Sequence, residues 1–223
     1  MNSGIKINYR LYPGREYLKS SHSIWNEHYT RLKSRLSYPD ENLVRILSRV
    51  GLAEGSNALD FGSGSGRHSF LLKNQGFRVT ALDSAENSLE MVKELVPEAR
   101  TILSSAPPYP FSNKEFDLIV SWGALHYNSQ DVIQSIVSEY KRILKDNGVL
   151  AGTIRADRDT HLSVYNGKSS LGDISGADVN LFSEAQVRNL FIEFSSVELG
   201  YMERTPIGKL EERICHWIFL VKK

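Results

Sequence analysis

The chain has 223 residues, of which 41% are hydrophobic and 24% are charged. That length predicts one large domain, and the composition is typical of a globular protein, which excludes a disordered, collagenous or coiled-coil chain. The 27 basic and 26 acidic side chains leave a net charge of +1, so no overall field attracts nucleic acid or an anionic membrane. Residues 1–50 carry nine basic against four acidic side chains. This local excess has two interpretations, a solvated helical face or a surface for an anionic ligand.

The cysteine content and the lack of long apolar runs predict the compartment. Cys215 is the single cysteine and lies in the apolar run 214–221, so we expect a buried thiol and no internal disulfide. Residues 1–14 lack the apolar core of a secretory signal, and no run approaches the roughly 20 apolar residues of a membrane span. We therefore expect a cytoplasmic protein without a membrane partner, and its oligomeric state stays open.

The first 50 residues predict helices that precede the main fold. A helical pattern covers residues 15–36, Pro39 interrupts it, and Asp40 is the expected cap of a second helix. We expect residues 1–50 to form a helical cap or lid and residues 51–223 to form the main domain.

Aromatic side chains recur in the first of these helices, at Tyr17, Trp25 and Tyr29. Trp25 and Tyr29 lie one helical turn apart and therefore share a face. Aromatic faces attract cations, so both residues are candidates for a lid over a positively charged ligand. The alternative is packing of an appended helix against the core.

From Gly51 onward, short β-rich runs alternate with amphipathic helices, which predicts a parallel sheet with helices on both faces. The last two β-rich runs have no helix between them and predict an antiparallel hairpin. The sequence thus favours an α/β fold: a doubly wound, Rossmann-like, seven-stranded sheet with a terminal antiparallel hairpin and appended N-terminal helices. The expected strands are 58–61, 77–82, 100–103, 116–121, 148–154, 195–202 and 213–221, and the expected helices are 65–75, 85–96, 130–144 and 183–193.

Residues 155–182 form a long polar connection within this pattern. Connections longer than about 12–15 residues tend to be functional or disordered, so this one is either a substrate loop or a mobile excursion. Arg155 follows the fifth strand directly, and Arg158, His161 and Lys168 come after it. Such a cluster either holds a phosphate or carboxylate of a substrate or consists of solvated charges.

The strongest chemical signal is a glycine-rich turn between a buried strand and a helix. Gly62, Gly64 and Gly66 allow a ligand to approach main-chain N–H groups closely. The next strand ends in Asp83, about twenty residues on, where a carboxylate can accept hydrogen bonds from ribose hydroxyls. The structural alternative is a plain strand-to-helix turn, with Asp83 as a helix N-cap.

Two cofactor classes use this arrangement, and the spacing separates them. A dinucleotide site has the pattern G-x-G-x-x-G, whereas the glycines here read G-x-G-x-G. Asp60 lies two residues before the first of them, and its charge suits a cationic amino group better than a pyrophosphate. A ligand with an ammonium, a ribose and an adenine is therefore favoured, and an NAD-dependent oxidoreductase is the alternative.

In the order of these motifs, residues from about 40 to 154 resemble the class I S-adenosylmethionine-dependent methyltransferases. The resemblance implies S-adenosyl-L-methionine as the cofactor, with its methionine part on the glycine loop and its ribose on Asp83. The family often has an Asp where Ser105 stands, so Ser105 or backbone is expected at the adenine amino group. The resemblance assigns cofactor contacts to Asp60, Gly62, Ser63, Gly64, Gly66, Asp83, Ser84, Ser105, Ala106 and Ser121.

The residues after the fourth strand are candidates for the methyl-transfer step. His126 lies just past the expected carboxyl end of that strand, and an imidazole that titrates near neutrality can take a proton from a hydroxyl or an amine. A positioning role is the alternative. Trp25, Tyr29, Tyr127 and Arg155 are the expected substrate or lid residues. No metal site is expected, because the chain has one cysteine and no close cluster of ligands near the site.

These observations predict an S-adenosylmethionine-dependent methyltransferase that modifies an oxygen or nitrogen of a small molecule. The appended residues and the single long loop leave little room for recognition of a macromolecule, so a nucleic acid partner is not expected. The alternatives are a methyltransferase of RNA or protein and a non-catalytic protein that binds the cofactor. The identity of the acceptor and the need for a general base stay open.

Overall fold

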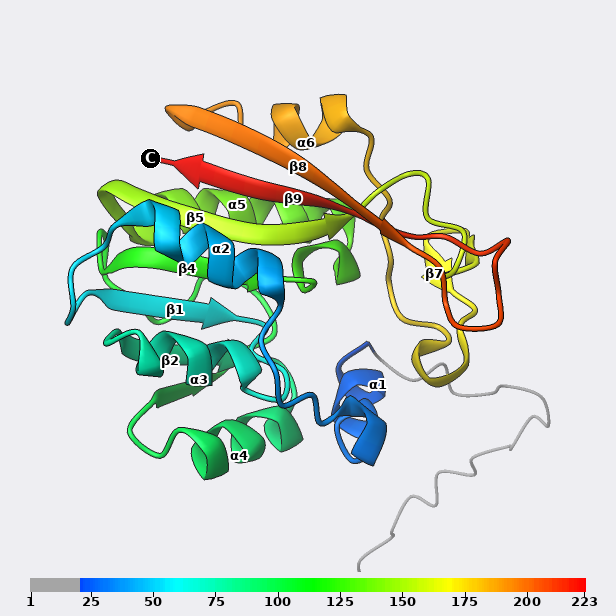
Figure 1. The fold of residues 1–223 in the computed structure, drawn as a ribbon, viewed down its shortest axis with the longest axis horizontal. Coiled ribbons are helices and arrows are strands. Elements are labelled where there is room, and N and C mark those ends of the chain that lie inside the picture. The colour runs from blue at the N-terminus through cyan, green and yellow to red at the C-terminus, as the bar shows by residue number, and fades with distance from the viewer. Residues whose placement is uncertain (1–20) are drawn as a thin grey trace, which may run out of the picture.

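A computed structural model of the chain describes residues 21–223. Its centre is a seven-stranded sheet in the order β3-β2-β1-β4-β5-β9-β8 (Figure 1). The first five strands are parallel, and β9 pairs antiparallel with β5 and with β8. The strands are β1 (Asn57–Phe61), β2 (Arg78–Asp83), β3 (Arg100–Leu103), β4 (Phe116–Trp122), β5 (Leu144–Arg155), β8 (Ser196–Arg204) and β9 (Ile214–Lys222).

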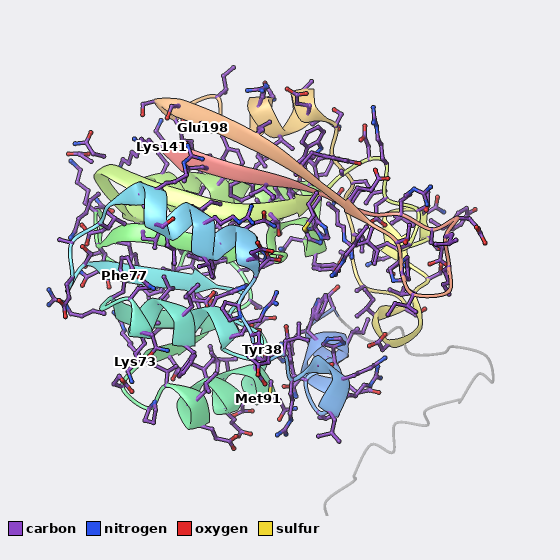
Figure 2. All side chains as sticks on the ribbon, in the orientation of Figure 1. Tyr38, Lys73, Phe77, Met91, Lys141 and Glu198 are labelled. Carbon is purple, nitrogen blue, oxygen red and sulfur yellow. The ribbon has the colours of Figure 1, made fainter. Side chains whose placement is uncertain are left out.

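Helices cover both faces of the sheet because its central strands are apolar on both sides. In β1, for example, Ala58 faces α2 (Glu41–Val50) and α3 (Arg67–Asn74), whereas Leu59 faces α5 (Gln130–Ile143) and α6 (Glu184–Leu190). The remaining helix, α4 (Glu86–Leu95), packs on β2 and β3. Side chains fill the layers between the helices and the sheet (Figure 2). The predicted α/β class, the seven-stranded sheet and the terminal hairpin are confirmed.

The N-terminal helices differ from the prediction in their bounds and in their packing. Within the described residues, the expected helix 15–36 is α1 (Ser21–His28) followed by the short 3-10 turn η1 (Leu32–Ser34), and Tyr17 lies outside them. The cap of α2 is as expected, because the Asp40 side chain accepts a hydrogen bond from the Asn42 N–H at 2.9 Å. Helix α2 belongs to the sheet, however, since Leu43 and Ile46 pack into its core. The part of the expected cap that lies away from the sheet is therefore α1 with η1.

The connection 155–182 folds on itself. It contains the two-stranded hairpin of β6 (Val164–Tyr165) and β7 (Lys168–Ser169) and the 3-10 turn η3 (Gly172–Ile174). Its buried apolar side chains pack against Ile24 of α1 in a small cluster of their own. The long loop and α1 thus form one unit beside the carboxyl ends of the parallel strands (Figure 1).

Two further expectations concern the thiol and the membrane. Cys215 is buried and unpaired, as predicted. No helix in residues 21–223 has the length and apolar character needed to cross a bilayer.

Candidate active site

The glycine loop is a tight cradle between β1 and α3. Gly62 and Gly64 have φ angles of 67° and 52°, a left-handed conformation that favours glycine. A Cβ on Gly62 would overlap the Ala124 side chain, and one on Gly64 would lie 2.7 Å from the Tyr29 hydroxyl. The cradle is therefore approached from two sides, by the segment after β4 and by the aromatic residues at the end of α1.

Asp83, the last residue of β2, joins the cradle to the neighbouring strand. Its buried carboxylate accepts hydrogen bonds from the backbone N–H of Gly64 at 2.8 Å and of Ala85 at 2.9 Å. Burial raises the pKa of Asp83, and these hydrogen bonds oppose the shift. Asp83 thus holds the turn between β2 and α4 and presents a carboxyl group to a cavity. The N-cap of α4 is Ala85, and not Asp83 as the structural alternative expected.

Asp60 lies under the cradle. Only 1% of it is exposed, and its carboxylate accepts a hydrogen bond from the Ser69 hydroxyl at 2.7 Å. Burial raises the pKa of Asp60 to about 6, with the nearby Asp83 charge adding to the shift and Ser69 opposing it. Asp60 does not line either of the cavities described below, so direct contact with a ligand is not supported for it.

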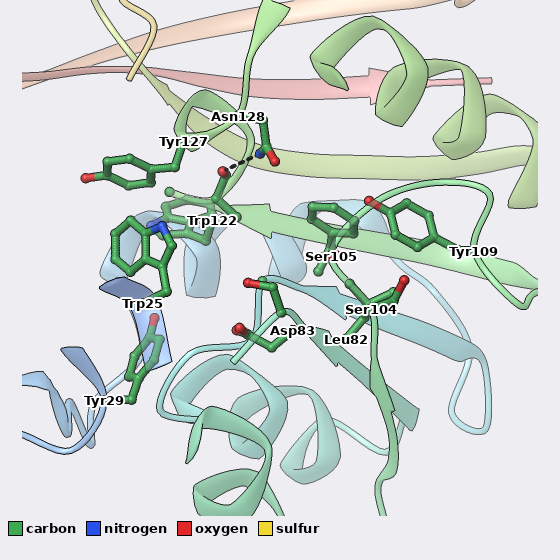
Figure 3. A pocket seen from close by; sticks show the side chains of 15 residues that line it. Trp25, Tyr29, Leu82, Asp83, Ser104, Ser105, Tyr109, Trp122, Tyr127 and Asn128 are labelled. Atoms are coloured by element: carbon green, nitrogen blue, oxygen red, sulfur yellow. Dashed lines mark hydrogen bonds between the residues drawn. The ribbon is translucent and has the colours of Figure 1, made fainter. Parts of the chain in front are cut away.

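A cavity of about 620 Å³, open to solvent, lies at the carboxyl ends of β1, β2 and β4 (Figure 3). We call it the cofactor cavity. Asp83 alone is charged among the described residues that line it. Three further lining residues, Ser104, Tyr109 and Asn128, were not among the candidates from the sequence. Ser104 follows β3 and Asn128 follows β4, and ligands of open α/β sheets bind beyond the carboxyl ends of the strands. The predicted residues that line the cavity are Gly62, Asp83, Ser84, Ser105, Trp25, Tyr29 and Tyr127.

A second cavity, which is also open to solvent and has a volume of about 1320 Å³, adjoins the first, and we call it the acceptor chamber. The two share Trp25, Tyr29, Trp122 and Tyr127, so these aromatic residues stand where the cavities meet. The ring centroids of Trp25 and Tyr127 are 4.6 Å apart in an edge-on contact. The predicted residues Ser63, Gly64 and Arg155 line the chamber, and so do Lys33, Arg67, His161, Asp173 and Arg204.

Besides Asp60, three predicted cofactor residues line neither cavity, so direct contact with the cofactor is not supported for them. Gly66 begins α3 with a φ of 80°, and a Cβ there would lie 3.1 Å from the Val92 side chain, so it sets the packing of the loop on α4. Ser121 is fully buried and accepts a hydrogen bond from the Tyr140 hydroxyl at 2.9 Å. The third residue is Ala106.

The position of His126 does not favour the expected catalytic role. The side chain is fully buried, lines neither cavity, and has no hydrogen-bond partner for either ring nitrogen within residues 21–223. Burial lowers the pKa of His126 well below its usual value, and the Arg155 charge adds to this shift. A neutral imidazole behind Tyr127, whose ring centroid is 4.1 Å away, is not placed to take a proton from an acceptor.

Helix α1 is held over both cavities by polar contacts at each end. Asn26 accepts hydrogen bonds from the backbone and side chain of Asn87 in α4, at 3.1 and 2.9 Å. Ser21 donates to Asp178 of the long loop at 2.8 Å. The ring of Trp25 is thereby fixed above the cofactor cavity (Figure 3).

This strand order, the glycine cradle after β1 and the carboxylate at the end of β2 agree with the resemblance to the class I S-adenosylmethionine-dependent methyltransferases. A family model described as "Methyltransferase domain" matches residues 58–148. An uncharacterized methyltransferase of Synechocystis sp. is 33% identical over 105 residues, which are 47% of this chain and 50% of that protein. Over residues 58–148 the chain resembles a methyltransferase domain. The chain spans about half the length of the curated relatives it matches.

Solved structures share the fold at low sequence identity. A 1,6-didemethyltoxoflavin-N1-methyltransferase of Burkholderia thailandensis, with bound 1,6-didemethyltoxoflavin and S-adenosylhomocysteine, has a TM-score of 0.66 and 18% identity over 97% of this chain and 93% of that chain. A putative methyltransferase in complex with the Trm112 methyltransferase activator of Haloferax volcanii has a TM-score of 0.69 and 16% identity over 91% and 95% of the two chains. Both likenesses concern the fold.

Proposed function

We propose that the protein is an S-adenosylmethionine-dependent methyltransferase that methylates an oxygen or nitrogen of a small molecule. The observation that carries the proposal is the junction of the two cavities. Trp25, Trp122 and Tyr127 line both the cofactor cavity, which holds Asp83 and the glycine cradle, and the acceptor chamber. A donor in one cavity and an acceptor in the other would meet at these three rings.

The cofactor cavity suits this cofactor in charge. Asp60 and Asp83 place negative charge at the cradle, which favours a ligand with a sulfonium and an ammonium and disfavours the pyrophosphate of a dinucleotide. When bound, the cofactor supplies an activated methyl group, with the ribose on Asp83 and the amino acid part along Gly62, Ser63 and Gly64.

The protein's contribution to the step is orientation and exclusion of water. Trp25 and Tyr29 cover the cavity from α1, and Tyr127 faces them from the segment after β4. Burial raises the pKa of Tyr127, although the Arg155 charge opposes the shift, so the phenol keeps its proton near neutral pH. Tyr127 therefore orients the acceptor as a hydrogen-bond donor and does not deprotonate it.

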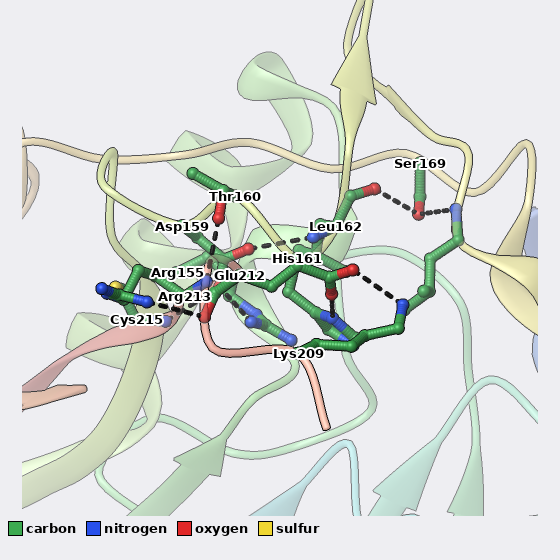
Figure 4. A network of polar contacts seen from close by, with 11 residues as sticks. Arg155, Asp159, Thr160, His161, Leu162, Ser169, Lys209, Glu212, Arg213 and Cys215 are labelled. Atoms are coloured by element: carbon green, nitrogen blue, oxygen red, sulfur yellow. Dashed lines mark hydrogen bonds and ion pairs between the residues drawn. The ribbon is translucent and has the colours of Figure 1, made fainter. Parts of the chain in front are cut away.

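If the acceptor atom must lose a proton before it is methylated, a residue other than Tyr127 has to act as the general base. His161 lines the chamber, and its Nδ1 lies 2.6 Å from the Glu212 carboxylate, which orients the ring (Figure 4). We place the general base there, in preference to the buried His126.

The small-molecule assignment is supported by the walls of the chamber. Its lining residues come from α1, η1, η3 and the ends of β5 and β8, so the chain's own elements close the chamber on these sides. Methylation of RNA or protein is the competing function, and it requires the chamber to admit part of a macromolecule.

Calorimetric titration with S-adenosylhomocysteine tests the cofactor assignment. We expect the wild type to bind, and the Asp83→Ala variant to bind at least about 100-fold more weakly, because charged hydrogen bonds are each worth roughly 1.5–3 kcal/mol. Asp146→Ala, which removes an exposed carboxylate paired with Lys114, is the matched control and should bind as the wild type does. Tight binding of NADH, or equal binding by the Asp83 variant, would overturn the assignment.

A further inference from the structure

The two adjoining cavities carry charges of opposite sign. The cofactor cavity has Asp83 as its charged lining residue, whereas the described residues that line the acceptor chamber include the four cations Lys33, Arg67, Arg155 and Arg204. Among the described lining residues, the one carboxylate, Asp173, is already paired. It lies 3.0 Å from Lys33, 3.4 Å from Arg31 and 3.2 Å from His28. It therefore does not neutralise the three arginines.

Arg155 is the most buried of these arginines, with 10% of its side chain exposed. Its Nη1 forms an ion pair with Asp159 (Figure 4), but the Asp159 carboxylate also accepts the backbone N–H of Cys215 at 2.9 Å and of Leu162 at 3.0 Å. The Nε of Arg155 is buried without a partner in the described part of the chain. Because a guanidinium keeps its charge in proteins, Arg155 is a cation that its surroundings compensate only in part.

The other two arginines add to this field. Arg67, at the start of α3, donates to the Tyr38 carbonyl at 3.2 Å, and the Asp40 carboxylate offsets part of its charge. Arg204, the last residue of β8, is exposed and has no ion pair within residues 21–223. Its charge repels that of Arg67. The neighbouring imidazoles are neutral, since burial lowers the pKa of both His68 and His216 to about 3.

We propose that the acceptor chamber binds an anionic group of the methyl acceptor, a carboxylate or a phosphate, between Arg155 and Arg204. Arg155 is held by β5 and Asp159, and arginine presents paired donors that match the oxygens of either group. The rest of the acceptor then extends past Tyr127 toward the cofactor cavity, because Tyr127 lines both. This inference rests on the proposed function, since it names the substrate class of the same site.

The test uses the tryptophans that line the chamber, Trp25 and Trp122. The full chain is titrated with sodium phosphate and separately with sodium acetate, each at constant ionic strength made up with sodium chloride, with and without saturating S-adenosylhomocysteine. Tryptophan fluorescence is the readout. We expect a saturable change with at least one of the two anions. A response to phosphate alone identifies a phosphate on the acceptor, and a response to acetate alone identifies a carboxylate.

Three variants assign the response to the chamber. Arg204→Gln removes an exposed cation without burying an uncompensated charge, and Arg155→Lys keeps the positive charge that Asp159 requires. Each should raise the dissociation constant of the anion about tenfold, because one charged hydrogen-bonding partner is lost or misplaced. Arg188→Gln is the matched control, since Arg188 pairs with Glu184 on the surface of α6, away from the chamber.

No saturable response to either anion would overturn the inference, and so would a response that neither chamber variant weakens. The calorimetric titration keeps the two proposals apart. If S-adenosylhomocysteine binds and the anions do not, the anion subsite is wrong and the proposed function stands. If the anions bind with the expected effects of the variants and S-adenosylhomocysteine does not bind, the proposed function fails while the chamber remains an anion site.

Discussion

Asp60 and Asp83 are buried together beneath and beside the glycine cradle. The negative charge of Asp83 helps to raise the pKa of Asp60, because two nearby carboxylates resist losing both protons. Without a cationic ligand, this arrangement lowers the stability of the fold. A bound sulfonium and ammonium would relieve the repulsion.

We predict that Asp60→Asn stabilises the protein at pH 7.5. The pKa of Asp60 rises from 3.8 in the unfolded chain to about 6 in the fold, so the folded state binds the proton more tightly. The charged form therefore opposes folding fully above pH 6 and ceases to do so below pH 3.8. The variant should gain on the order of 2–3 kcal/mol at pH 7.5, with a smaller gain at pH 4.5, in urea unfolding. A loss of stability at pH 7.5 would contradict this account of Asp60.

We predict that His126→Phe leaves methyl transfer within about twofold of the wild type. The substitution removes two buried ring nitrogens that lack partners among the described residues, and such groups cost roughly 1–3 kcal/mol each in a fold. Thermal unfolding should show unchanged or slightly higher stability. If the turnover rate instead falls by about two orders of magnitude or more while the fold stays intact, the catalytic role that the sequence suggested is restored.

The site residues differ in how far their roles can be predicted from their positions in the sequence. Asp83 and the glycines were predictable because the strand ends and the turn itself dictate where they lie. Ser121 lies near the end of β4 and His126 lies in the 3-10 turn that follows, yet both side chains are buried in the core. The direction of a side chain depends on packing against distant residues such as Tyr140, which the local sequence does not encode.

At the scale of elements, α1 is the part of the cap that faces the cavities. We predict that Asn87→Ala raises the dissociation constant of S-adenosylhomocysteine about fivefold, because it removes one side-chain hydrogen bond between α4 and α1, worth roughly 1 kcal/mol. Hydrogen exchange should quicken in residues 21–34 and stay unchanged in the sheet. Unchanged affinity together with faster exchange would show that α1 does not act as a lid.

The centre of the sheet depends on a glycine in β5. A Cβ on Gly152 would overlap the Ser121 carbonyl oxygen and would lie 2.5 Å from the Phe219 ring. We therefore predict that Gly152→Ala costs at least about 3 kcal/mol or prevents folding, because β4 and β9 must move apart. Gly172→Ala is the matched control, since a Cβ there meets no atom within 4 Å, and urea unfolding compares the two. Equal stability of both variants would refute this argument.

The helices and strands have nearly their expected bounds where the hydrophobic periodicity of the sequence is strong. Helix α5 and strands β1 to β4 lie within two residues of their expected bounds. A capping box of Ser183 and Gln186 begins α6, at the expected start of the helix 183–193. The N-terminal helices were less predictable. The pattern of Leu43 and Ile46 fits a lid helix and a core helix equally well, and only the sheet that it covers distinguishes them.

At the scale of the whole molecule, the alternation of strands and helices was sufficient to predict the sheet and the edge at which a ligand binds. The acceptor chamber was not predictable in the same way. Its cations come from η1, α3, β5 and β8, which are far apart in the sequence and meet only in the folded chain. The contrast between a negative cofactor cavity and a positive chamber is therefore a property of the fold, although the net charge of the chain is +1.

The most direct test of the central claim is methyl transfer from radiolabelled S-adenosylmethionine into a cell extract, separated afterwards into small molecules, RNA and protein. The Asp83→Ala variant serves as the blank. We expect label in the small-molecule fraction with the wild type and none with the variant. Label confined to RNA or protein would contradict a small-molecule acceptor, and no transfer by a protein that binds S-adenosylhomocysteine would contradict methyl transfer itself.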